Sequence, residues 1–188
     1  MEINENQKKG FLARLLGHLY TVHEHRSLVR RNCFACGLYW QGLTHDLSKY
    51  SPSEFWPSVR YYQGYRSPYT LQKEMQGYAP GWLHHKGRNR HHWEYWYDTL
   101  DGHWQPIRMP DRFLAEMVCD RVAASRTYLR ERYTSSSPLQ YFESRAESGY
   151  MNPATRDSLH HILAMISDQG EQETFRWIRM RLKHSQPL

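Results

Sequence analysis

The feature that most limits the possible folds of this chain is a helical repeat of apolar residues near its start. Between residues 7 and 36, such side chains recur at intervals of three, four and seven, the spacing that places them on one face of an α-helix. The row consists of Phe11, Leu15, His18, Val22, His25, Val29 and Cys36. We therefore predict a helix from about Gln7 to about Cys36, ended by Gly37, whose core-facing side carries two histidines.

Helical signals also dominate the remaining sequence. Ser51, Pro52 and Glu54 occupy the positions of an N-cap, a first-turn proline and a capping-box glutamate, so they predict that a helix begins there. Further helices are predicted at about 70–85 with a break near Gly77 and Pro80, at 90–98, at 111–133, from Pro138, from Pro153 and at 171–183. Residues 101–110 are predicted to form a loop, and no segment alternates convincingly as a strand would. We expect an all-α fold.

The length of 188 residues suits one domain with a substantial core. We expect residues 1–188 to form a single helical domain, in which a motif-bearing core at about 16–130 is followed by packing helices at about 138–184. Cys33, Cys36 and Cys119 cannot all pair, and we expect them to be small apolar core residues in a reducing cytoplasm. No apolar run approaches the length of a signal peptide or a spanning helix, so we expect no membrane partner.

The chain carries an excess of positive charge. The formal net charge is +6 at pH 7, and aromatic residues make up 14% of the sequence. A basic surface attracts anions, so phosphate-bearing small molecules such as nucleotides are candidate partners, and so is nucleic acid. A modest excess of charge is equally expected of a protein that is merely soluble.

The strongest chemical signal is the dipeptide His45-Asp46, followed by Lys49 three residues later. An imidazole nitrogen and a carboxylate oxygen are both common ligands of Zn, Mn, Fe or Ni, so adjacent His and Asp can bind one ion. His25 and Asp120 are the best candidates for the remaining ligands, because each interrupts the apolar face of a predicted long helix. In isolation, His25 could instead be a hydrogen-bonded core histidine, and Asp120 could form a salt bridge with an arginine.

These four residues occur in the order H…HD…D, and a lysine follows the pair to give H-D-x-x-K. This order resembles the motif of the HD-domain superfamily of metal-dependent phosphohydrolases, over about residues 16–128. The resemblance implies a helical bundle of the HD type. It also implies that the four residues hold a divalent metal ion between helices.

A second cluster of histidines lies in residues 84–92. It comprises His84, His85, His91 and His92. Two branches of the HD superfamily use additional histidines to hold a second metal, so the resemblance implies a second ion with a ligand from each His-His pair. Lys86, Arg88 and Arg90 would then contact substrate phosphate. Alternatively, the segment is a histidine-rich loop that packs on aromatic residues and exposes these three charges to solvent.

Longer stretches of sequence carry a more specific resemblance. They are residues 45–55, 82–96, 109–110 and 116–120. Together they are similar to a bacterial and phage family of unknown function, DUF5662. We expect this match to cover about residues 16–130. It implies no particular reaction, because the family is defined by sequence alone.

From these residues we hypothesise that the protein hydrolyses a phosphate ester or nucleotide with one or two divalent ions of Mn, Zn, Ni, Mg or Fe. The metal would bind a phosphate oxygen and lower the pKa of bound water towards about 7. Lys49 would neutralise phosphate charge, and Glu54 could be a general acid or base unless it serves only as a capping residue. His18 lies two turns from His25, about 10 Å along the axis, so we expect it not to bind the same ion.

Two alternatives come from other classes of protein. Some HD-fold proteins with two extra histidines hold a di-iron centre that activates oxygen, and this chain resembles them too. A basic, aromatic-rich surface could also bind nucleic acid by stacking and phosphate contacts, without any enzymatic activity. The aromatic residues of that surface would include Tyr61, Tyr62, Tyr65, Trp93, Tyr95 and Trp96.

Overall fold

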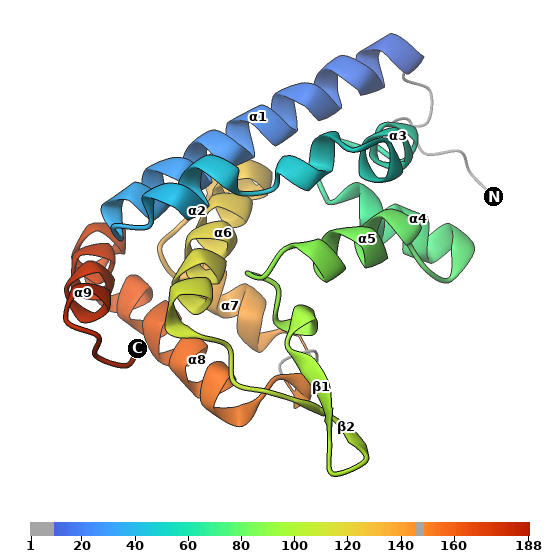
Figure 1. Ribbon diagram of the computed structural model, residues 1–188. Coiled ribbons are helices and arrows are strands. Elements are labelled where there is room, and N and C mark those ends of the chain that lie inside the picture. Colours follow the sequence, from blue (N-terminus) through green and yellow to red (C-terminus); the bar gives the residue numbers. More distant parts are fainter. Residues whose placement is uncertain (1–9, 146–148) are drawn as a thin grey trace.

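Helices form almost the whole structure, so the predicted all-α fold is confirmed (Figure 1). The structure is a computed structural model that describes residues 10–145 and 149–188. The α-helices are α1 Phe11–Ala35, α2 Tyr39–Thr44, α3 Pro52–Arg60, α4 Pro68–Gln76, α5 Pro80–Arg88, α6 Asp111–Leu129, α7 Ser137–Glu143, α8 Pro153–Gln169 and α9 Glu171–Lys183. Short 3₁₀ helices are η2 Leu47–Tyr50, η3 Trp93–Tyr95 and η4 Arg130–Arg132.

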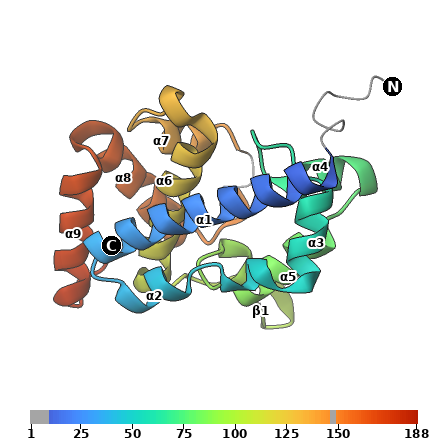
Figure 2. The same ribbon diagram turned by 90° about the horizontal axis from the view of Figure 1, so that it is seen from above.

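Helix α1 is the longest of the described elements, and the others are arranged around it (Figure 2). It begins at Phe11, and the predicted start near Gln7 lies outside the described residues. It ends at Ala35, and Gly37 then takes a left-handed conformation with a φ of 79°, which glycine adopts at little cost. Helix α2 then folds back along α1, α3 packs nearer its N-terminal end, and α6 packs across it.

The apolar core lies where the C-terminal half of α1 meets α6, α8 and α9. Side chains that are fully excluded from solvent include Val29 and Cys33 of α1, Val118 and Val122 of α6, Leu159, Ile162 and Ile166 of α8, and Ile178 of α9. Cys36 and Cys119 are buried in the same core as free thiols, as predicted. The side-chain amide of Asn32 donates a hydrogen bond to the carbonyl of Cys119 at 3.2 Å. This packing fixes α1 against α6, and so fixes the polar residues that the two helices carry.

The segment between α5 and α6 differs from the prediction. Of the helix predicted at 90–98, only the short turn η3 forms. An antiparallel hairpin of β1 Tyr97–Leu100 and β2 His103–Pro106 follows, and its second strand lies within the loop predicted at 101–110. Both predictions were therefore wrong. The hairpin turn is Asp101-Gly102, with φ angles of 51° and 76°. Asp-Gly is a preferred pair for two-residue turns with two positive φ angles, so the sequence does carry this signal.

The histidine-rich segment is only partly helical. The helix predicted at 70–85 forms as two helices, α4 and α5, and the break falls as expected at Gly77, whose φ is 78°. Helix α5 continues through Gly87 but ends at Arg88, so His91 lies beyond it.

Among the helices of the described residues, none is long and apolar enough to cross a membrane.

Candidate metal centre

Four of the predicted ligands come from three separate parts of the fold. His25 lies within α1, Asp120 lies at the middle of α6, and His45-Asp46 link α2 to η2. Asp46 has a φ of 55° and a ψ of 26°, a left-handed conformation that is uncommon for residues other than glycine. This turn ends α2 and aims the carboxylate of Asp46 at His25.

These four side chains converge. Nε2 of His25 is 3.0 Å from Oδ1 of Asp120 and 3.6 Å from Oδ2 of Asp46. Nε2 of His45 is 3.4 Å from Oδ2 of Asp46 and 3.6 Å from Oδ1 of Asp120. The structure thus brings the predicted quartet together. Asp120 pairs with these two histidines. Within residues 10–145 and 149–188 it forms no salt bridge with an arginine.

A second group of histidines faces the other oxygen of Asp46. His85 comes from the last turn of α5, and His91 and His92 come from the loop that follows. Nε2 of His85 and Nε2 of His91 are each 3.4 Å from Oδ1 of Asp46. With His92 they form a group whose four ligand atoms lie within 4.8 Å of one another. This group therefore contains both histidines of the pair His91-His92 but only His85 of the pair His84-His85.

His84 and the predicted phosphate-binding residues lie outside these groups. Nδ1 of His84 is 2.6 Å from Oε1 of Glu54, and Arg88 donates a hydrogen bond to Nε2 of His84 at 2.7 Å. Both ring nitrogens of His84 are thus engaged away from the two groups. The guanidinium of Arg90 lies over two aromatic rings. Contact of Lys86, Arg88 and Arg90 with phosphate stays a prediction.

The unpaired atoms of this cluster fit a bound cation. The buried atoms without a hydrogen-bond partner in the described chain include Nε2 of His25, His45, His91 and His92 and Oδ1 of Asp46. Each such atom costs about 1–3 kcal/mol, so several at one place point to a cation that they share. The residues could hold one ion at His25, His45 and Asp46 and another at Asp46, His85, His91 and His92. Imidazole and carboxylate are the donors of many Zn, Mn, Fe and Ni sites.

Glu116 orients two of these histidines and was not among the predicted site residues. Its Oε1 atom is 2.9 Å from Nδ1 of His45 and 3.1 Å from Nδ1 of His91. A carboxylate that accepts a hydrogen bond from Nδ1 fixes the imidazole tautomer and leaves Nε2 free for a metal. Glu116 precedes Asp120 by four residues on α6, which places both carboxylates on one face of the helix. This spacing is the signal that could have identified it.

Glu54 orients His85 in the same way. It is fully buried, and its Oε2 atom is 2.7 Å from Nδ1 of His85. The capping interpretation of Glu54 was therefore wrong, and Ser51 makes no side-chain hydrogen bond as the N-cap of α3. Burial alone would raise the pKa of Glu54, but hydrogen bonds from His85 and His84 lower it below its usual value. Glu54 is thus an ionised acceptor.

Neighbouring charges keep the aspartates of the centre ionised. Burial alone would raise the pKa of Asp46, but the charges of His45 and Lys49 hold it well below its usual range. Burial opposes ionisation of Asp120 as well, and the neighbouring imidazoles of His25 and His45 hold its pKa well below the usual value. Both carboxylates are therefore in the form that binds a cation.

Lys49 and Asp120 are partly exposed residues of the centre. Their side chains are 22% and 17% exposed, whereas those of His45 and Asp46 are 0% and 1% exposed. Nζ of Lys49 is 2.7 Å from Oδ2 of Asp46. Burial opposes its charge, but Asp46 raises the pKa of Lys49 above its usual value. A ligand that approaches from solvent would therefore meet a charged ammonium group beside the carboxylates.

His18 belongs to none of the metal-binding groups of the described chain. Its ring centre is 5.4 Å from that of Phe55 and 6.1 Å from that of Tyr62. Burial, and then the charge of Lys49, lower the pKa of His18 from 6.5 to about 4. Between these two pH values the unfolded chain binds a proton that the folded protein does not bind. Acid therefore destabilises the fold through this residue.

We expect the free energy of unfolding to fall by about 2 kcal/mol more in wild type than in His18→Gln between about pH 7 and pH 5. Urea unfolding of both proteins measures this difference, with metal removed beforehand so that its loss in acid does not contribute. His184→Gln, at an exposed position after α9, should behave as wild type. Identical pH dependence in wild type and His18→Gln would show that His18 is not held neutral by burial.

Comparison with known proteins identifies one family. No curated protein and no solved structure matches the chain. Residues 14–165 match a family of unknown function, DUF5662. The match extends beyond the expected range of about 16–130 and includes every residue of the two metal-binding groups. Because the match covers most of the sequence, the chain belongs to the DUF5662 family.

Proposed function

We propose that this protein is a metal-dependent phosphohydrolase of the HD type, which uses two divalent ions to hydrolyse a phosphate ester or nucleotide. The observation that carries the proposal is the position of Asp46 between two groups of histidines. Its Oδ2 atom faces His25 and His45, and its Oδ1 atom faces His85 and His91. A carboxylate in this position can bridge two ions, which in two-metal phosphatases lie about 3.5–4 Å apart.

The donor set favours transition-metal ions. The two groups contain the imidazoles of His25, His45, His85, His91 and His92. Imidazole suits Zn, Fe or Ni, and Mn also accepts such mixed sites, whereas Mg prefers oxygen ligands alone. Ions bound here would polarise a phosphate oxygen and lower the pKa of water. The buried histidines and Asp46 would keep bulk water out of the rest of the site.

Lys49 is the residue best placed to bind the phosphate group. Its side chain is partly exposed beside Asp46, and its ammonium stays protonated at neutral pH. It can donate a hydrogen bond to a phosphate oxygen and so stabilise negative charge that develops during the transfer. Glu54 is enclosed by His84 and His85, so we assign to it the positioning of His85 and not the proton transfer.

Phosphate release from nucleoside monophosphates and p-nitrophenyl phosphate tests the proposal. We expect the Mn-loaded wild type to hydrolyse at least one of them, and a chelator to abolish the activity. Lys49→Met should retain its metal but lower kcat/KM about 100-fold, because a charged donor to the phosphate is lost. Lys183→Met removes the same charge from an exposed position at the end of α9 and should change nothing. A wild type that carries two ions and hydrolyses none of the panel would contradict the proposal.

A di-iron oxygenase is the second candidate, because the same histidines and Asp46 also fit two iron ions. About two iron atoms per chain and a coloured protein after aerobic purification would favour it. The nucleic-acid alternative has less support. Tyr61 is buried, and Trp93 and Trp96 pack against the apolar core, so fewer rings are free to stack on bases.

A further inference from the structure

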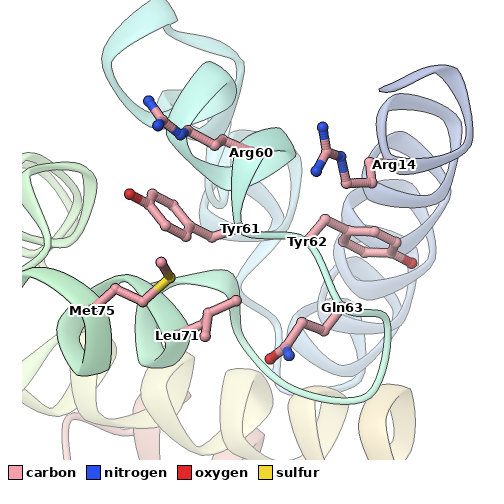
Figure 3. Close-up of a pocket in the computed structure, with 7 residues that line it drawn as sticks. All are labelled: Arg14, Arg60, Tyr61, Tyr62, Gln63, Leu71 and Met75. Atoms are coloured by element: carbon pink, nitrogen blue, oxygen red, sulfur yellow. The ribbon is translucent and has the colours of Figure 1, made fainter. Parts of the chain in front are cut away.

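A pocket lies between the N-terminal part of α1, the end of α3, and α4 (Figure 3). Its volume is about 230 Å³. Arg14 and Arg60 lie along one side of the hollow, and Leu71 and Met75 lie along the opposite side. Arg14 precedes His25 by eleven residues on α1, which corresponds to about 16 Å along the helix axis. The pocket is therefore separate from the metal centre.

The charged groups that the described residues bring to this pocket are positive. That part of the lining contains the guanidinium groups of Arg14 and Arg60 and no carboxylate. Within the described part of the chain neither arginine forms an ion pair, and Nε of Arg14 is buried without a hydrogen-bond partner. Glu74 of α4 does not neutralise them, because Arg66 binds both of its oxygens at 2.6 and 2.7 Å. Two cations beside one hollow favour an anionic ligand.

The other walls of the pocket are held in place by neighbouring residues. A Cβ atom at Gly17 would come within 2.5 Å of Cε1 of Tyr62, so the ring fits there only because residue 17 is glycine. The hydroxyl of Tyr62 is hydrogen-bonded to Thr21 at 2.9 Å. Gln63 accepts a hydrogen bond from Arg66 at 2.6 Å through Oε1, which orients its amide group. A preformed site of this kind loses little entropy when a ligand binds.

We propose that this pocket binds a small organic anion, whose phosphate or carboxylate group contacts the two arginines and whose apolar ring packs between Tyr61, Tyr62 and Met75. Guanidinium groups bind both kinds of anion through paired N–H donors. The volume is below the range of about 300–1,000 Å³ that is typical of pockets for drug-sized ligands. The part of the ligand that the pocket encloses is therefore about the size of a single ring. This site is independent of the hydrolysis proposed for the metal centre.

Calorimetric titration with phenyl phosphate, benzoate and inorganic phosphate tests this proposal. We expect phenyl phosphate or benzoate to bind equally well to metal-free wild type and to Asp46→Asn, because the metal centre takes no part. Arg14→Gln and Arg60→Gln should each weaken binding about tenfold or more, since each removes a charged donor. Arg30→Gln removes the same charge from an exposed position on α1 outside the pocket and should leave binding unchanged.

Amide chemical shifts locate the bound probe, and we expect them to change at Gln63 and Met75. Tighter binding of phenyl phosphate assigns the ligand to the phosphate class, and tighter binding of benzoate assigns it to the carboxylate class. Three results would overturn the proposal. The first is that neither ring compound binds at millimolar concentration. The second is that Arg30→Gln and Arg14→Gln lose the same amount of binding affinity. The third is that inorganic phosphate binds as tightly as phenyl phosphate. Circular dichroism verifies that each variant is folded.

Discussion

Asp46→Asn is expected to fold but to lose its ability to hold two metal ions. Asparagine keeps the shape of the side chain and tolerates the left-handed backbone at this position, where φ is 55°. The substitution removes the negative charge shared by the two groups of histidines and replaces one ligand oxygen with an amide nitrogen. The affinity for divalent ions should fall about 100-fold or more. Any hydrolysis of phosphate esters should fall with it.

Elemental analysis of untagged wild type and Asp46→Asn, purified side by side, measures this loss. Asp157→Asn is the matched control, because Asp157 is an exposed residue of α8 that pairs with Arg156 at the surface. We expect about two ions per chain in wild type and in the control. Full metal content in Asp46→Asn would show that the histidines bind metal without a bridging carboxylate.

Glu116→Gln is expected to weaken the binding of both metal ions, although Glu116 is not itself a proposed ligand. Its carboxylate holds His45, which belongs to the first group, and His91, which belongs to the second. An amide offers a weaker acceptor and adds N–H groups that oppose the imidazole donors. Loss of such an orienting carboxylate lowers metal affinity about 10–100-fold.

Glu54→Gln provides the matched comparison, because Glu54 orients His85 of the second group. This variant should weaken one of two binding steps, whereas Glu116→Gln should weaken both. Titration of the metal-free proteins with Zn in competition with a chelator resolves the two steps. If Glu116→Gln binds both ions as tightly as wild type, the orienting role of Glu116 is wrong.

The quartet of His25, His45, Asp46 and Asp120 was predicted from features that stand out in the sequence. His25 and Asp120 lie on apolar helix faces, where a buried polar side chain needs a partner. His45-Asp46 are adjacent, so one turn of the chain can present both. The structure brings these four residues together at 3.0–3.6 Å, although they are far apart in sequence. Periodicity marked His25 and Asp120 as candidates, and the resemblance to the HD motif joined them to His45-Asp46.

The second group could be predicted only in part, because loops have no periodicity. His91 and His92 follow the end of α5 at Arg88 and reach the centre through an irregular segment. The path of such a segment depends on tertiary contacts, so the sequence could not distinguish within either His-His pair. Glu116 was missed because a glutamate in a helix usually serves as a solvated residue.

The pocket at Arg14 could not be predicted at all. It exists because Tyr62 packs on Gly17 and because α4 lies opposite α1. Neither contact leaves a pattern in the local sequence. The hairpin is the opposite case, since Asp101-Gly102 is a recognisable turn signal, but its short strands are too exposed to show alternation.

Anomalous diffraction from crystals grown with Mn tests most directly whether Asp46 bridges two ions. We predict two anomalous peaks per chain, about 3.5–4 Å apart, on the two sides of the Asp46 carboxylate. One peak should adjoin His25 and His45, and the other should adjoin His85 and His91. A single peak, or none, at these residues in metal-saturated protein would contradict the two-ion centre.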